Sequence, residues 1–394
     1  MLINNEELFE NLKLDNYKIQ KKQPFDKNTL QFLYSLSSAI LKNKQSKKYP
    51  DLITFGFFCR KSNLIKNKIR YEKELEVRIG LGLSVHIAPS NIPINFAFSF
   101  VFGLLSGNAN AIRLPSKPYP QNLLLLEIIN NLLNKEDFKD IKDSTIFFNS
   151  HRDSLKLKEL CRKADALIVW GGDSTVQTFK NYVKKINCIE LLFPNRLSSL
   201  IINSKVFVEE KNKRNILEKF YNDTYLVDQN ACSSPTNIFW YGDKHINKKA
   251  QILFWDELKK VLKNKNYHLP TISQFDKYIN VLRALNETSN KLNIEIHDAN
   301  IWEGLNAHNS SKYFNLGLFS SLNIINLNQM TNQIRDNEQT ITYFGLDPKK
   351  INDAIKLGQV TVDRIVPIGS ALDIGLIWDG KDVIRYLSTY TEVL

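Results

Sequence analysis

The fold class follows from one stretch of the chain, Gly80-Leu81-Gly82-Leu83-Ser84-Val85-His86-Ile87-Ala88-Pro89-Ser90-Asn91-Ile92-Pro93. Its apolar and β-branched residues predict a buried strand, and the polar turn that follows leads into an apolar helix ending at Gly107-Asn108. In α/β folds, this order of strand, polar turn and helix places ligand-binding groups at the carboxyl end of the strand. His86 lies inside the predicted strand, so we expect a hydrogen-bonded core histidine there.

Two further units of the same kind follow. Residues 109–114 predict a strand that runs into Pro115-Ser116-Lys117-Pro118 and then a helix. Residues 166–170 predict another, which ends in Gly171-Gly172-Asp173-Ser174-Thr175 ahead of a helix. A glycine pair at a helix N-terminus is typical of a phosphate-binding turn. An ordinary serine-capped turn explains the same residues equally well. Consecutive units of this kind predict an α/β fold with a parallel sheet.

Length and composition narrow the class further. A chain of 394 residues exceeds what one hydrophobic core normally serves, so two domains are expected. The net charge of +12 fits a polyanion or a phosphate-bearing substrate, but the lysines are scattered, and biased composition alone also explains them. The N-terminus lacks a secretory pattern, and the longest apolar stretch, residues 92–105, is too short for a membrane span. We therefore expect a cytoplasmic protein.

Other segments carry weaker patterns. Residues 52–58 read as a short extended or buried apolar run, and residues 71–79 alternate as a half-buried strand does. From residue 242 to about 300 the pattern is helical and rich in lysine. We identify no catalytic constellation in that last segment.

The cysteines single out one position. Cys59, Cys161, Cys188 and Cys232 lie far apart without a CxxC pair, which argues against a zinc site and against a disulfide framework. Cys232 alone has small and polar neighbours, in the segment Asp228-Gln229-Asn230-Ala231-Cys232-Ser233-Ser234-Pro235. Donors on Gln229, Asn230, Ser233 and Ser234 could stabilise a thiolate or an oxyanion. Cys232 is therefore a candidate nucleophile, with an incidental thiol as the alternative.

Several motifs in this order resemble the acyl-CoA reductase family typified by the LuxC-type fatty acyl reductase, within the aldehyde dehydrogenase superfamily. The resemblance covers most of the chain from about residue 50. It rests on the stretches 86–96, 103–110, 113–117, 228–235 and 364–369. The family implies an aldehyde-dehydrogenase-like fold with a Rossmann-type dinucleotide-binding domain at 1–198, including an oligomerisation strand near 71–79. It also implies an α/β catalytic domain at 199–370 that carries Cys232, and a C-terminal oligomerisation or return segment at 371–394.

The resemblance also implies roles for individual residues. Cys232 matches the nucleophile, and Asn91 matches the asparagine whose amide helps to form the oxyanion hole. The positions that hold the nicotinamide dinucleotide match Ser90, Arg113, Ser116, Lys117, Gly171, Gly172 and Ser174. Superfamily members commonly have an acid where Lys117 stands, so a basic residue there favours NADPH, with NADH possible. No metal is implied.

The expected reaction is reduction of an acyl thioester, acyl-CoA or protein-bound, to an aldehyde through a Cys232 acyl-enzyme in a homo-oligomer. One departure supports reduction, because Leu192 stands where hydrolytic aldehyde dehydrogenases keep a water-activating glutamate. Glu190 lies two residues away and could substitute, so NAD(P)-dependent oxidation of an aldehyde to an acid is an alternative. A non-catalytic, polyanion-binding protein on the same fold is a third.

Overall fold

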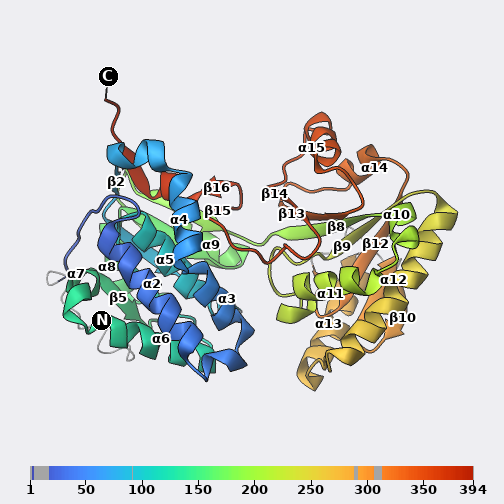
Figure 1. The fold of residues 1–394 in the computed structure, drawn as a ribbon, viewed down its shortest axis with the longest axis horizontal. Helices are drawn as coiled ribbons and strands as arrows, with labels where there is room; N and C mark the ends of the chain where they lie inside the picture. The colour runs from blue at the N-terminus through green and yellow to red at the C-terminus, as the bar shows by residue number, and fades with distance from the viewer. Residues whose placement is uncertain (1, 4–16, 91, 288–291, 306–312, 394) are drawn as a thin grey trace. The chain divides into compact units, whose positions relative to one another are not determined.

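The computed structural model describes residues 2–3, 17–90, 92–287, 292–305 and 313–393. It divides into two compact units (Figure 1). Unit 1 comprises Met1–Pro194 and Ile374–Leu394, and unit 2 comprises Asn195–Asp373. The chain thus leaves unit 1 once and returns to it at the end.

Unit 1 is built on a six-stranded sheet whose neighbouring strands are all parallel, as predicted. In spatial order its strands are β1 (Leu2–Ile3), β5 (Thr145–Phe148), β4 (Ala109–Arg113), β3 (Leu83–Ile87), β6 (Ala166–Trp170) and β7 (Ile189–Phe193). From β3 the chain moves outward to β4 and β5, and then crosses to β6 on the other side of β3. The strand order therefore reverses between β3 and β6, which is where α/β sheets bind ligands.

Helices cover both faces of this sheet because strand side chains alternate between the faces. Ile112, Phe147 and Ile168 share one core with the helices of the first face, and Val85, Ile146 and Val169 share another with the helices of the second. The first face carries α2 (Lys27–Lys42), α3 (Pro50–Phe58), α5 (Asn95–Leu105) and α6 (Pro120–Leu133). The second carries α8 (Leu155–Lys163) and α9 (Asp173–Lys180). The remaining short elements of this part are η2 (Ser46–Lys48), α4 (Lys61–Ile69), η3 (Glu72–Val77), η4 (Glu136–Phe138) and α7 (Lys139–Asp143).

Two predictions for unit 1 are wrong. Residues 52–58, expected to be extended, belong to helix α3, which starts with Pro50 in its first turn and Asp51 beside it, a combination that favours a helix start. Residues 71–79, expected to be a strand, form the 3-10 turn η3, and the strand β2 covers only Arg78–Gly80. The strand is short because its partner β17 (Ser388–Tyr390) pairs with only these three residues.

Unit 2 contains a seven-stranded sheet that is parallel except at one edge. In spatial order its strands are β10 (Asn293–Asp298), β11 (Ile301–Leu305), β12 (Leu318–Ile324), β9 (Asn237–Tyr241), β8 (Leu197–Asn203), β13 (Glu338–Phe344) and β14 (Arg364–Pro367). Helices α10 (Ser204–Glu209), α11 (Lys213–Asp223) and α12 (Lys244–Asn264) pack on one face. The other face carries α13 (Thr271–Glu287), α14 (Leu327–Thr331) and α15 (Pro348–Leu357). The edge strand β10 runs antiparallel to β11, so the expectation of helix up to residue 300 is wrong for its last part.

The C-terminal segment completes unit 1. Its elements are β15 (Ile377–Trp378), β16 (Lys381–Asp382), α16 (Val383–Tyr386) and β17. Leu376, Ile384 and Leu387 are fully buried in the unit 1 core, and Asn108 donates from Nδ2 to the carbonyl of Leu387 at 2.8 Å. Among the residues that the structure describes, every helix is too short or too polar to span a bilayer.

Candidate active site

Cys232 lies on a turn in unit 2 between α11 and β9. After the 3-10 turn η5 (Tyr225–Val227), Asp228 and Gln229 both adopt left-handed backbone, with φ of 50° and 57°. Non-glycine residues rarely take this conformation, so surrounding contacts must hold it. The turn leaves Cys232 half-buried, five residues before β9 begins.

Gln229 supplies most of those contacts. Its side chain is 4% exposed, and its Oε1 accepts from the backbone N–H of Gly317 at 2.9 Å. Its Nε2 donates to the carbonyls of Pro235 at 2.8 Å and Leu318 at 3.3 Å. Gln229 was expected to offer a donor to the thiolate, but the structure shows its amide bonded to backbone that fixes the loop to the start of β12.

Ser198 holds the cysteine from the central strands. Its Oγ donates to the carbonyl of Cys232 at 2.7 Å and accepts from the N–H of Thr340 at 3.2 Å. The loop is therefore attached to β8 and β13 as well as to β12. Ser233 and Ser234 are 8% and 1% exposed, so both lie inside the loop.

Glu338, the first residue of β13, is a buried acid in the same part of unit 2. It is fully buried, and burial raises the pKa of its carboxyl to about 7, although Ser199 and Arg196 lower it in part. An acid with such a pKa can hold or release a proton near neutral pH.

The other three cysteines differ from Cys232. Cys59 and Cys161 are fully buried; burial raises the pKa of the Cys161 thiol to about 12 and that of Cys59 further above its ordinary value. Burial, together with the nearby Glu190, raises the pKa of Cys188 to about 11. Because the thiolate is the nucleophile, these three thiols are poor candidates for chemistry.

In unit 1, the predicted dinucleotide-binding residues gather at one edge of the sheet. Ser90 follows β3, Ser116 and Lys117 follow β4, and the turn 171–174 follows β6. These three strands are adjacent and parallel, so their carboxyl ends meet at the position where the strand order reverses.

Contacts within this edge are specific. The hydroxyls of Ser90 and Ser116 lie 2.8 Å apart, within hydrogen-bond distance, and the Tyr119 hydroxyl donates to the carbonyl of Ser90 at 2.9 Å. The Lys117 ammonium lies 5.2 Å from the centroid of the Tyr119 ring. Arg113 donates from Nε to the carbonyl of Ser150 at 2.8 Å, so its guanidinium is held at the loop after β5.

The glycine turn after β6 packs closely against the first turn of α9. Gly172 is the N-cap of α9, and Ser174 lies in the first turn of that helix. A Cβ on Gly171 would lie 3.1 Å from Cγ2 of Thr175, so a side chain there would crowd the turn. Asp173 also stands in this first turn and adds negative charge next to the helix N-terminus.

His86 is a core residue, as predicted. It is fully buried; its Nδ1 lies 2.7 Å from Oγ of Ser99 and its Nε2 lies 3.0 Å from Oδ1 of Asn110. Burial lowers its pKa to about 4, so the imidazole is neutral at physiological pH.

The predicted catalytic roles of two further residues, Asn91 and Glu190, stay predictions. Asn91 lies outside the described residues. Glu190, the alternative base, is on β7 in unit 1 and makes an ion pair with Nζ of Lys184 at 2.8 Å. Leu192, at the position of the hydrolytic glutamate, lies on the same strand and is half-buried.

Sequence reasoning missed one cluster of polar side chains. Glu295 and His297 on β10 lie close to Glu303 on β11, with their ligand atoms within 4.8 Å of one another. The alternation of Ile294, Glu295, Ile296 and His297 is a strand pattern that the surrounding helical segments obscured.

Comparison with known proteins agrees with this architecture. The family model described as acyl-CoA reductase (LuxC) matches residues 6–390. A long-chain acyl-protein thioester reductase of Vibrio harveyi is 25% identical over 174 residues; the match spans 44% of this chain but only 35% of that protein.

Solved structures show the same fold at low sequence identity. A 1-pyrroline-5-carboxylate dehydrogenase of Thermus thermophilus superposes with a TM-score of 0.71 at 11% identity, over 98% of this chain and 84% of its own. A structure of 1-pyrroline-5-carboxylate dehydrogenase from Thermus with bound NAD superposes with a TM-score of 0.68 at 10% identity, over 98% and 82%. The expected aldehyde-dehydrogenase-like fold is thus confirmed, and the chain belongs to the acyl-CoA reductase (LuxC) family.

Proposed function

We propose that this protein reduces an acyl thioester to an aldehyde and that Cys232 carries the acyl group. The observation that supports this most directly is the placement of Cys232. It is a half-buried thiol on a polar loop whose backbone is fixed by Gln229 and Ser198. A nucleophile held on a rigid backbone needs little reorganisation when it attacks.

The proposed steps balance when a hydride donor is the second reactant. The Cys232 thiolate attacks the carbonyl carbon of the thioester, and the thiol of the donor leaves as a new thioester forms on Cys232. Addition of a hydride to that carbonyl carbon gives a thiohemiacetal anion, whose carbon–sulfur bond breaks to release the aldehyde and regenerate the thiolate. Relatives named long-chain acyl-protein thioester reductases suggest a long acyl chain on the donor.

The hydride donor that we propose is a reduced nicotinamide dinucleotide bound by unit 1. The residues present fit it, because two serine hydroxyls, a lysine and a glycine turn lie where the strand order reverses. Ser90, Ser116 and Lys117 would hold the ribose side, with Arg113 near them. Gly171, Gly172 and Ser174 would face the phosphates.

We propose that the protein reduces its acyl-enzyme rather than hydrolysing it to an acid. The proposed alternative base, Glu190, is already paired with Lys184 on a strand of unit 1. We propose that the acyl-enzyme therefore meets hydride before it is hydrolysed.

Replacement of Cys232 by alanine tests the proposal. We expect Cys232→Ala to abolish formation of a covalent acyl adduct, read by intact-protein mass spectrometry with an acyl-CoA, and to abolish aldehyde production. Dinucleotide binding, measured by fluorescence titration, should stay within about twofold. Cys188→Ala is the matched control and should form the adduct normally; an adduct that persists in Cys232→Ala would refute the assignment.

A charge reversal at Lys117 tests the choice of cofactor. We propose NADPH as the preferred donor, because a lysine beside Ser116 can neutralise a ribose 2′-phosphate. In Lys117→Glu the ratio of kcat/KM for NADPH to that for NADH should fall by at least about tenfold, which is ~1.4 kcal/mol. Lys135→Glu changes an exposed lysine just after the C-terminal end of α6 and should leave the ratio unchanged. An unaltered ratio in Lys117→Glu would contradict the role proposed for Lys117.

We also propose that the chain forms a homo-oligomer. The small two-stranded sheets β2–β17 and β15–β16 have edges that can pair with another copy. Light scattering coupled to size-exclusion chromatography would measure the mass, and a monomer at micromolar concentration would contradict the proposal.

A further inference from the structure

The edge hairpin of unit 2 brings together three side chains with the chemistry of metal ligands. Glu295 and Glu303 are paired across β10 and β11, and residues directly opposite in an antiparallel pair point to the same face. The register shifts between Ile296 and Asp298, so His297 sits at a β-bulge. Bulges of this kind redirect a side chain, and here one carboxylate of each strand and an imidazole converge.

Glu303 shows that this cluster is incomplete. The residue is 2% exposed and belongs to a strand whose same-face neighbour Ile301 lies in the apolar core beneath α12. Its Oε2 lies 2.7 Å from Nε2 of His297, but its buried Oε1 has no hydrogen-bond partner among the described residues. A buried carboxylate oxygen without a partner is costly, and it points to a missing cation or donor.

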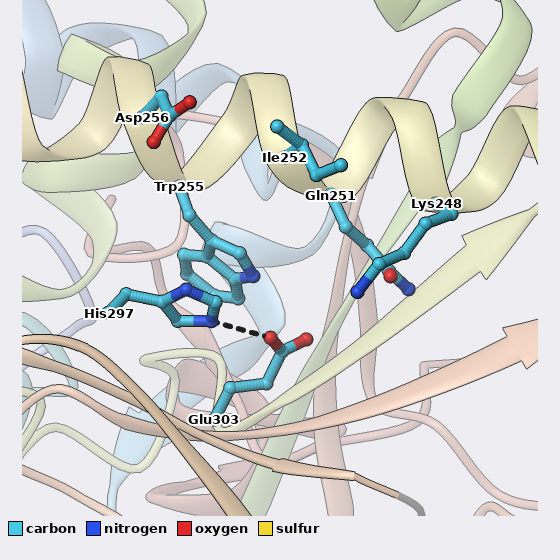
Figure 2. Close-up of a pocket in the computed structure, with 7 residues that line it drawn as sticks. All are labelled: Lys248, Gln251, Ile252, Trp255, Asp256, His297 and Glu303. Atoms are coloured by element: carbon cyan, nitrogen blue, oxygen red, sulfur yellow. Dashed lines mark hydrogen bonds and ion pairs between the residues drawn. The ribbon is translucent and has the colours of Figure 1, made fainter.

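A small cavity lies at the same place. It has a volume of about 140 Å³ and is lined by Lys248, Gln251, Ile252, Trp255, Asp256, His297 and Glu303 (Figure 2). The Trp255 ring stacks on the His297 ring, with centroids 5.3 Å apart and planes at 25°. This contact restrains the imidazole, so its orientation is set before any ligand arrives.

An ion pair between Lys248 and Oε1 of Glu303 is the alternative to a bound cation. Its side chain comes from the exposed side of α12 and lines the same cavity, yet within the described chain it makes no ion pair with Glu303. Two carboxylates facing each other across a strand pair repel unless a positive charge lies between them. A proton on His297, whose Nε2 lies 2.7 Å from Oε2 of Glu303, supplies such a charge, and a bound cation would take the place of that proton.

We propose that Glu295, His297 and Glu303 form a binding site for a divalent transition-metal cation of the zinc class. The ligand atoms lie within 4.8 Å of one another, so small side-chain rotations bring one nitrogen and two oxygens to the 2.0–2.2 Å that such a cation requires. The imidazole disfavours Mg²⁺ and Ca²⁺, which prefer all-oxygen sites. The cation would cross-link the two outermost strands of the sheet.

Titration with Zn²⁺ alone tests this site. The chelator-treated full chain should carry the substitution Cys232→Ser, so that the reactive thiol does not bind zinc. Calorimetry should then show one saturable site per chain, and 1 mM Mg²⁺ should not displace the zinc. His297→Gln and Glu295→Gln should each weaken binding by on the order of 100-fold, since loss of a ligand exceeds the 10–100-fold cost of losing a group that only supports one.

Two control variants separate a built site from surface binding. His245→Gln removes an exposed histidine beside Asp243 in the same unit and should leave the affinity unchanged. Lys248→Met should leave it unchanged or tighten it, because it removes a positive charge from the cavity. The melting temperature should rise with Zn²⁺ in the parent chain but not in His297→Gln. Absence of saturable binding, or equal affinity in the parent and in His297→Gln, would overturn the proposal.

Discussion

At the scale of single residues, the candidate nucleophile depends on a glutamine that does no chemistry. Gln229 has one acceptor and a donor group on the same amide, and the structure uses both to hold three backbone groups. Its own backbone is left-handed, so the side chain also stabilises a conformation that the turn would not keep unaided. The sequence shows a polar residue near Cys232, but it does not show which partner that residue chooses.

Removal of this side chain should loosen the loop. In Gln229→Ala the N–H of Gly317 and two carbonyls lose their partners, and we expect a loss of about 3 kcal/mol in the free energy of unfolding. Urea denaturation would measure it, and the rate of Cys232 acylation should fall as well. Asn230→Ala changes the exposed neighbour, whose side-chain oxygen accepts from Nδ2 of Asn315 at 3.3 Å, and should stay within ~0.5 kcal/mol of the parent. Equal stabilities of the two variants would contradict the role given to Gln229.

At the scale of elements, α5 shows how tightly the central strands of unit 1 are packed. All of its residues are buried, and Gly103 lies against β3 and β4. A Cβ at this position would lie 1.8 Å from Oδ1 of Asn110, the atom that contacts Nε2 of His86. The glycine is therefore required by close approach, not by backbone conformation.

A methyl group at position 103 should be strongly destabilising. Overpacking of this kind costs ~1–3 kcal/mol, and loss of the contact between Asn110 and His86 adds to it, so we expect about 3 kcal/mol for Gly103→Ala. The matched control is Gly375→Ala, where the nearest atom to the new Cβ is 3.9 Å away. Thermal unfolding measures the stability of both variants. A Gly103→Ala protein as stable as Gly375→Ala would contradict this prediction and show that α5 can shift to accommodate the methyl group.

Elements with a long and unambiguous pattern could be predicted from the sequence. The strands β3, β4 and β6, each flanked by a polar turn and a helix, occur where the pattern placed them. The prediction for segment 52–58 is wrong because a short, mostly apolar run suits a buried strand as well as a helix. Burial of Leu52, Phe55 and Phe58 at helical spacing becomes visible only in the folded structure. The strand β10 is missed because its alternating polar residues resemble a continuation of the lysine-rich helices before it.

At the scale of the whole molecule, sequence reasoning predicted the order of the parts but not their contacts. The resemblance to a family, supported by several motifs, indicated two α/β units and a thiol nucleophile. Order along the chain predicts that strand ends meet at one edge, and Ser90, Ser116 and the turn after Trp170 do so. Hydrogen bonds such as that from Ser198 to Cys232 join residues 34 positions apart, and no local pattern specifies them.

The return of the C-terminal segment to unit 1 leads to a prediction about the whole chain. Leu376, Val383, Ile384 and Leu387 are at most 1% exposed, and they fill the core on the face that carries α5. The strand β17 pairs with β2, and Arg385 makes an ion pair with Glu74 at 2.5 Å. The apolar burial outweighs this exposed ion pair, which contributes little in water.

Truncation after Asp373 should therefore destabilise unit 1 selectively. Loss of four buried aliphatic side chains removes roughly 6 kcal/mol of hydrophobic stabilisation, which corresponds to a fall of roughly 15 °C in Tm. Hydrogen exchange read by mass spectrometry should show faster exchange in β2 and α5, while β9 and β12 of unit 2 keep their protection. If the truncated chain aggregates, Leu387→Ala provides a milder change of about 3 kcal/mol in the same core. Removal of only residues 392–394 is the control, because Glu392 and Val393 are exposed and should contribute little to stability. Unchanged hydrogen exchange in β2 after the longer truncation would mean that unit 1 folds without its last segment.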